Sequence, residues 1–135
     1  MVADVDRAAM RAWIETYERA WRTSGTEVLG RLFAADATYR TAPFEEPFRG
    51  LGAISAMWEE NRDGPDEVFE LESEVVAVEG DVGVVRVEVR YANRAQIYRD
   101  LWIVRLDDAG RCAAFEEWPF WPPGSEGEFA KGPQN

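Results

Sequence analysis

The feature that most constrains this fold is the segment VVRVEVRY at residues 84–91, in which apolar and charged residues alternate. Strict alternation predicts a β-strand, because successive side chains of a strand point to opposite faces of the sheet. The apolar face carries Val85, Val87, Val89 and Tyr91. The charged face carries Arg86, Glu88 and Arg90. The apolar face must be covered by a second layer, whereas the charged face can either meet water or line a cavity.

The same period of two extends over most of the C-terminal half. It predicts strands over about residues 68–79, 82–93, 96–107 and 111–118. Short turn sequences separate these strands, so an antiparallel meander is the simplest connection.

The N-terminal part has helical periodicity instead. Apolar residues at three- and four-residue spacing predict a helix over about residues 4–22, a short helix that begins at the capping box of Ser24, and a third helix that begins at Leu51 and ends before Gly64. A short strand over residues 37–41 precedes the third helix. Helices followed by a meander favour an α+β fold, with the helices packed on one face of a curved sheet.

The 135 residues fit one domain, predicted over residues 1–121, with a tail at 122–135. A formal net charge of -11 disfavours nucleic acid and anionic membranes as partners. The N-terminus lacks a signal-peptide pattern, and no segment is long and apolar enough to span a membrane. Together with a single cysteine, Cys112, these features predict a cytoplasmic protein.

The residue types that are missing limit the chemistry. The sequence has no histidine, which excludes a histidine base, Ser-His and Cys-His pairs and His-ligated zinc. Its only lysine, Lys131, falls in the predicted tail, which makes Schiff-base chemistry improbable. Carboxylates are the remaining acid–base groups, and we expect neither a metal nor an organic cofactor.

Several segments resemble the nuclear transport factor 2-like superfamily. They are LFAADATY at residues 32–39, the loop at 43–50, the helix with Ile54 and Trp58, and the D-x-G-R turn at 108–111. The resemblance covers about residues 5–121. It implies a cone-shaped α+β fold in which three N-terminal helices pack on a curved, mostly antiparallel sheet. The superfamily includes ketosteroid isomerases, SnoaL-type polyketide cyclases and limonene epoxide hydrolase.

The site pattern is partly similar to that of limonene epoxide hydrolase. The matching positions read Tyr39-Arg40-Thr41, Arg86-Val87-Glu88 and Glu117. This resemblance implies that Glu117 activates a water also held by Tyr39, that Glu88 protonates the leaving oxygen, and that Arg86 bridges the two carboxylates. Two carboxylates that share one arginine can have different pKa values and so act as acid and base.

The other two family chemistries match less well. In the ketosteroid isomerase pattern Tyr17 falls on the helix-one tyrosine, but Thr41 and Trp102 replace the base and the acid, and neither can do that chemistry. The SnoaL-type acidic residue on the last strand falls near Glu117, whereas the partner histidine of that type is absent.

Strand spacing predicts a further carboxylate in the site. If Leu106 and Arg111 face each other across the last turn, Asp100 lies opposite Glu117 and Trp102 lies opposite Phe115. Two carboxylates so placed need a cation, a shared proton or open solvent.

These observations predict a partly apolar cavity with acidic groups inside. The predicted catalytic residues are Glu117, Arg86, Glu88, Tyr39 and Asp100. The predicted substrate-binding residues are Tyr17, Trp21, Thr41, Trp58, Trp102 and Phe115, although tryptophans at helical spacing are more often core.

The expected function is that of a hydrolase, isomerase or cyclase that uses carboxylate acid–base catalysis on a small, partly apolar molecule. The alternatives are a ligand-binding protein without catalysis and a dimeric accessory subunit. A homodimer through the sheet is expected because the face away from the helices carries Leu101 and Ile103.

Overall fold

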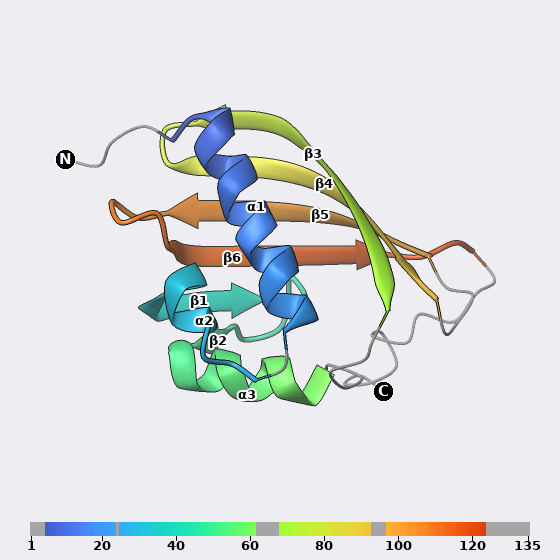
Figure 1. The fold of residues 1–135 in the computed structure, drawn as a ribbon, viewed down its shortest axis with the longest axis horizontal. Helices are drawn as coiled ribbons and strands as arrows, with labels where there is room; N and C mark the ends of the chain where they lie inside the picture. The colour runs from blue at the N-terminus through green and yellow to red at the C-terminus, as the bar shows by residue number, and fades with distance from the viewer. Residues whose placement is uncertain (1–4, 24, 62–67, 93–96, 124–135) are drawn as a thin grey trace.

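The computed structural model describes residues 5–23, 25–61, 68–92 and 97–123 (Figure 1). The elements in chain order are α1 (Arg7–Arg22), α2 (Leu29–Leu32), β1 (Phe33–Arg40), β2 (Phe48–Arg49), α3 (Leu51–Asn61), β3 (Phe69–Glu79), β4 (Val82–Tyr91), β5 (Ile97–Leu106) and β6 (Cys112–Phe120). The predicted tail from Gly124 onward lies outside the described residues. No helix within the described ranges is long and apolar enough to cross a membrane.

The strands form one sheet with the order β2-β1-β6-β5-β4-β3. The meander from β3 to β6 is antiparallel, as the sequence predicts. β1 joins the meander parallel to β6, and the short β2 pairs antiparallel with β1 at the edge. Figure 1 shows the strands curving around α1, with the helices on one side of the sheet. The α+β cone fold implied by the resemblance is therefore confirmed.

Helix α1 covers the concave face of the sheet. Asp6 caps its first turn by accepting a hydrogen bond from the Ala9 amide at 2.8 Å. Its buried stripe consists of Met10, Trp13, Ile14, Tyr17 and Ala20. The spacing of these residues places them on one side of the helix, so the predicted amphipathic helix packs as expected.

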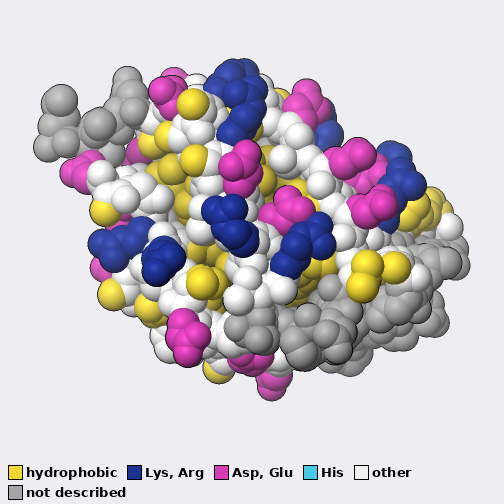
Figure 2. All heavy atoms as spheres, viewed as in Figure 1, with side chains coloured by type: hydrophobic (Ala, Val, Ile, Leu, Met, Phe, Trp, Pro, Cys, Tyr) yellow, Lys and Arg dark blue, Asp and Glu magenta, His cyan; other side chains and the backbone are white. Residues whose placement is uncertain are grey.

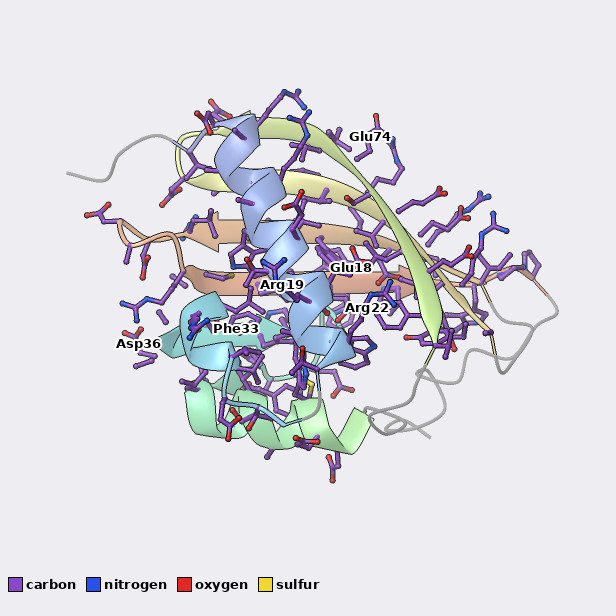
Figure 3. The ribbon with its side chains drawn as sticks, in the orientation of Figure 1. Glu18, Arg19, Arg22, Phe33, Asp36 and Glu74 are labelled. Carbon is purple, nitrogen blue, oxygen red and sulfur yellow. The ribbon has the colours of Figure 1, made fainter. Side chains whose placement is uncertain are left out.

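The opposite side of α1 is polar. Figure 3 shows Glu18 and Arg19 on the side of α1 that faces away from the sheet, and Figure 2 shows basic and acidic side chains interspersed over this face. Arg22 pairs with Glu18 at 2.6 Å and donates to the Phe69 carbonyl at 2.9 Å. It thereby ties the end of α1 to the start of β3.

The second helix differs from its prediction. α2 begins only at Leu29, and its N-cap, Val28, makes no side-chain capping bond. Ser24 of the predicted capping box lies outside the described residues. Two buried leucines, Leu29 and Leu32, hold this single turn against the core, so packing rather than capping stabilises it.

The two faces of β4 have different surroundings. Its apolar residues, from Val85 to Tyr91, are at most 8% exposed and face the helices. Arg86 points to the outer face, where it pairs with Glu74 at 2.8 Å, and both side chains are more than half exposed. Glu88 pairs there with Arg90 at 2.6 Å and with Arg99 at 3.1 Å.

The prediction that Arg86 and Glu88 lie on the cavity wall is therefore wrong. The alternation of β4 allows only one of its faces to meet the core, and the apolar face does so. The charged face is matched instead by its neighbours, since Glu74 stands opposite Arg86 and Arg99 opposite Glu88. Leu101 and Ile103 are half-buried on the outer side of β5, and the homodimer through this face stays a prediction.

Close contact between α1 and β4 gives a test of this packing. A Cβ on Gly83 would lie 2.9 Å from the Met10 Sδ, and Met10 is fully buried. We expect Gly83→Ala to lower the free energy of unfolding by about 1–3 kcal/mol, because the core must shift to admit the methyl group. Urea denaturation measures the loss.

The matched control is Gly52→Ala on α3, where an added Cβ meets nothing within 4 Å. This variant should keep or raise the stability, since alanine is the better helix residue. Met10→Ala combined with Gly83→Ala should cost less than the sum of the two single changes. If the two losses of stability were strictly additive, the contact with Met10 would not be the cause of the loss in Gly83→Ala.

Candidate active site

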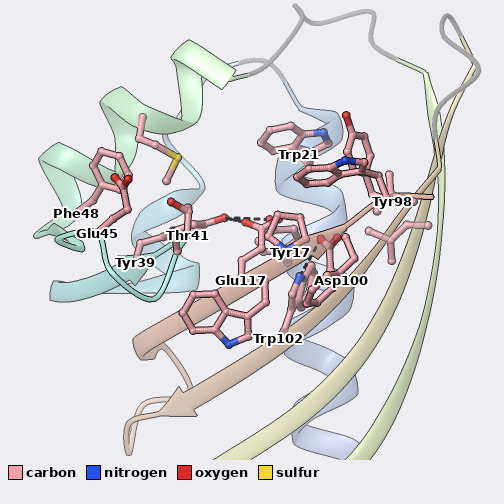
Figure 4. Close-up of a pocket in the computed structure, with 18 of the residues that line it drawn as sticks. Tyr17, Trp21, Tyr39, Thr41, Glu45, Phe48, Tyr98, Asp100, Trp102 and Glu117 are labelled. Atoms are coloured by element: carbon pink, nitrogen blue, oxygen red, sulfur yellow. Dashed lines mark hydrogen bonds between the residues drawn. The ribbon is translucent and has the colours of Figure 1, made fainter. Parts of the chain in front are cut away.

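A cavity of about 810 Å³ opens between the concave face of the sheet, α1, α3 and the loop that follows β1 (Figure 4). Aromatic side chains form much of its wall. Thr41, Glu45 and Phe48 lie on the loop side, and Trp21 and Tyr98 lie on the opposite side. The volume fits a small organic molecule of one to a few rings.

A chain of polar side chains crosses the inner end of the cavity. The Tyr39 hydroxyl donates to Oε1 of Glu117 at 2.8 Å, and the hydroxyls of Tyr17 and Tyr39 are 3.3 Å apart. Asp100 makes a side-chain hydrogen bond with Glu117 and accepts a long one, 3.4 Å, from the Trp102 indole. These five residues come from α1, β1, β5 and β6, so the fold itself brings them together.

The register of β5 and β6 differs from its prediction. Trp102 stands opposite Glu117, Val104 opposite Phe115, and Asp100 opposite Pro119. The observed pairing is shifted by two residues from the predicted one. The turn contributes the first, because Leu106 pairs with Cys112 and not with Arg111. A bulge contributes the second residue, and the next pair is Arg105 with Ala114.

The predicted proximity of Asp100 and Glu117 nevertheless holds. A shift of two residues leaves every side chain on its original face, because side chains alternate with a period of two. The two carboxyl groups are therefore diagonal neighbours on the cavity side of the sheet, close enough for their hydrogen bond.

Burial raises the pKa of both carboxyl groups, and their other contacts decide which of the two holds a proton. Desolvation, followed by the charge of Glu117 and the hydrogen bond with it, raises the pKa of Asp100 to about 9. Desolvation also raises the pKa of Glu117, but hydrogen bonds from Tyr39 and Asp100 oppose that rise. At neutral pH Asp100 therefore holds a proton, which it shares with Glu117 through their hydrogen bond. This proton also explains why Oδ1 of Asp100 is buried without an N–H or hydroxyl donor among the described residues.

The two tyrosines remain phenols over the same pH range. Burial first, and then the charge of Glu117, raise the pKa of Tyr17 and of Tyr39 well above 10. The inner end of the cavity thus combines two carboxyl groups that share a proton with one tyrosine donor. Such a set can remove a proton from a bound molecule and donate hydrogen bonds to the oxygen that becomes negative. Among the described residues, no group of three or more Cys, Asp or Glu side chains is placed to hold a metal ion.

The structure separates the predicted site residues into three groups. Those that line the cavity are Glu117, Tyr39, Asp100, Tyr17, Trp21, Thr41 and Trp102. Arg86 and Glu88 lie on the outer face of the sheet. Trp58 and Phe115, predicted to bind substrate, are fully buried behind the wall, where Trp58 packs on Tyr17 and Phe115 packs on Tyr39. Their placement as lining residues is thus wrong.

Some of the cavity wall was not predicted from the sequence. Tyr98 has the same strand parity as Asp100 and Trp102, and Tyr91 continues the apolar face of β4, so alternation alone could have identified both. Trp121 follows the end of β6 and carries no comparable signal.

Residues 10–115 match the model of the SnoaL-like domain family. No curated protein matches the chain.

Several solved structures share the fold. A proposed isomerase of the SnoaL-like family from Agrobacterium tumefaciens is 19% identical, with a TM-score of 0.68 over 84% of this chain and 98% of that one. A proposed polyketide cyclase from Sinorhizobium meliloti is 22% identical, with a TM-score of 0.63 over 81% and 97%. A steroid delta-isomerase from Pseudomonas aeruginosa is 22% identical, with a TM-score of 0.62 over 90% and 85%.

The raised pKa of Asp100 predicts how stability depends on pH. The folded protein keeps a proton that the unfolded chain releases above about pH 4, so the contribution of Asp100 is largest below that pH and is lost as the pH rises toward about 9. Asp100→Asn removes this dependence. Its free energy of unfolding relative to the wild type should rise between pH 5 and pH 8 by at least about 1 kcal/mol, measured by urea denaturation.

Glu72→Gln is the control, because Glu72 is an exposed carboxylate on β3. Its stability relative to the wild type should be nearly the same at both pH values. An equally flat difference for Asp100→Asn would mean that Asp100 is ionised in the folded protein.

Proposed function

Because this chain belongs to the SnoaL-like domain family, we propose that its cavity is an active site in which Glu117 and Asp100 move a proton on a small, partly apolar carbonyl compound. The protein then acts as an isomerase or cyclase without a cofactor. The observation that carries this proposal is the proton-sharing carboxyl pair at the inner end of an aromatic cavity.

Glu117 is the base in this scheme. It takes a proton from the carbon next to the carbonyl group, and the electron pair of the broken C–H bond moves onto the carbonyl oxygen. Tyr39 and Asp100 are the donors for this oxygen: both hydrogen-bond Glu117 in the free protein, and they are released to the substrate as Glu117 takes its proton. Returning the proton to another carbon gives an isomer, whereas attack of the carbanion on a second carbonyl closes a ring.

The position of Arg86 and Glu88 argues against epoxide hydrolysis and so favours an isomerase or cyclase. Epoxide hydrolysis in the limonene epoxide hydrolase manner needs an arginine between two carboxylates, and Arg86 and Glu88 face away from the cavity. The remaining pair, Asp100 and Glu117, contains no arginine and shares a proton instead. Isomerases and a proposed cyclase also occur among the structures with this fold.

Hydrogen–deuterium exchange tests the proposal without knowledge of the substrate. Flat ketones and β-diketones in D₂O should exchange the hydrogen next to the carbonyl faster with the protein than without it, as followed by NMR. Glu117→Gln should lower this rate by about 10²–10⁴-fold because the base is lost. Tyr39→Phe should lower it by about 10–10³-fold because a donor is lost.

Glu88→Gln and Arg86→Met are the matched controls. Both change charged residues of the same sheet on its outer face, so the exchange rate should stay within about twofold of the wild type. If Glu117→Gln exchanges as fast as the wild type, the cavity binds ligands without this catalysis.

A further inference from the structure

We propose that the cavity selects a flat, mostly apolar molecule that carries a protonated amine, and disfavours its neutral and anionic analogues. This inference uses the cavity of the proposed function and names the class of its ligand. Binding can be measured without turnover, so the two proposals can fail separately.

The charges of the cavity wall all have one sign. Its acidic lining residues are the exposed Glu45, Glu46 and Glu60 together with Glu117 and the protonated Asp100, and the described part of the wall includes no arginine or lysine. In a chain with 15 basic residues, this distribution gives the cavity a negative potential. Walls of low dielectric constant concentrate that potential inside.

The arginines near the cavity make contacts elsewhere. Arg40 donates to the backbone carbonyl of Glu45 at 2.6 Å, which holds the loop but leaves the Glu45 carboxylate available. Arg22 lies 4.0 Å from the centre of the Phe69 ring and binds the Phe69 carbonyl, and it does not line the cavity. Arg49 approaches Glu46 only at 3.8 Å, with both side chains mostly exposed.

Aromatic rings form a continuous wall on the side of Trp21 and Tyr98 (Figure 4). Ring centres are 6.0 Å apart for Phe69 and Tyr91, 5.9 Å for Tyr91 and Tyr98, and 6.4 Å for Tyr98 and Trp121. Rings of this kind attract an ammonium group through their faces and also pack against a flat apolar body. The contact of Arg22 with Phe69 shows that one ring of this wall already binds a cation.

The inner end of the cavity holds acidic groups and, among the described lining residues, no basic group. Asp100 is only 6% exposed and shares its proton with Glu117. A carboxylate or phosphate on the ligand would lose its hydration beside Glu117 with no cation to replace it. A protonated amine brings both a positive charge and donors to the same space.

Three probes that differ only in one polar group test the proposal. They are 2-naphthylmethylammonium, 2-naphthylmethanol and 2-naphthoate, each titrated calorimetrically into the full-length protein at pH 7 and low salt. We expect the ammonium to bind about tenfold more tightly than the alcohol, and the carboxylate to bind most weakly. Equal or tighter binding of the alcohol or the carboxylate would overturn the proposal, as would binding of none of the three.

Two triple variants locate the effect. Glu45→Gln/Glu46→Gln/Glu60→Gln should reduce the preference for ammonium over alcohol by about threefold or more while leaving the alcohol affinity unchanged. Glu15→Gln/Glu27→Gln/Glu79→Gln makes the same change in net charge at exposed positions that do not line the cavity, and should leave the preference intact. An equal loss in both variants would assign the effect to net charge and overturn the proposal.

Exchange at the carbonyl compounds keeps the two proposals apart. An ammonium preference without catalysed exchange supports the ligand class and rejects the proposed reaction. Exchange that depends on Glu117, without a preference for the ammonium probe, supports the proposed reaction and rejects the ligand class.

Discussion

The contacts of the Trp13 indole determine how the helices are placed against the sheet. The indole is 4% exposed, and its Nε1 donates to the Leu32 carbonyl at 2.9 Å, which fixes α1 to the end of α2, directly before β1. Its ring contacts Phe33 on β1, Trp102 on β5 and Phe115 on β6. One side chain thus sets the distance between α1 and three strands. Tyr17, one turn further along α1, reaches the polar chain of the cavity because Trp13 holds the helix in this position.

The fold could be predicted largely from periodicity. Spacings of three and four residues identified α1 and α3, and spacings of two identified β3 to β6, because both patterns arise from which side of an element is buried. The parallel pairing of β1 with β6 could not be predicted this way, since periodicity within a strand says nothing about its neighbours. The start of α2 was also missed, because a single turn held by two leucines has no cap to mark it.

The site was harder to predict than the fold. Tyr39 and Glu117, taken from the family resemblance, and Asp100, taken from strand parity, lie on the cavity wall because their positions along the strands give them the cavity face. Arg86 and Glu88 were misplaced because a motif match compares only the order of residues, whereas the face of β4 is decided by burial. Aromatic residues pose a similar problem. Trp58 and Trp102 are both apolar residues on the buried side of their elements, and the sequence does not distinguish them; only the packing shows that Trp102 lines the cavity and Trp58 does not.

The turn and the bulge between β5 and β6 together shift the pairing of the two strands by two residues from the pairing predicted for this hairpin. The even number has an evolutionary consequence. The turn is exposed, so a change in its length meets no core packing, whereas Gly110 has a φ of 83° that other residues adopt only with strain. If one residue gained or lost in this hairpin shifted the pairing of β6 with β5, Glu117 would move to the outer surface and Glu116 would face inside. A relative that keeps the cavity chemistry should therefore absorb an odd change of length within the loop or in a bulge, since only an even change in the pairing preserves the parity.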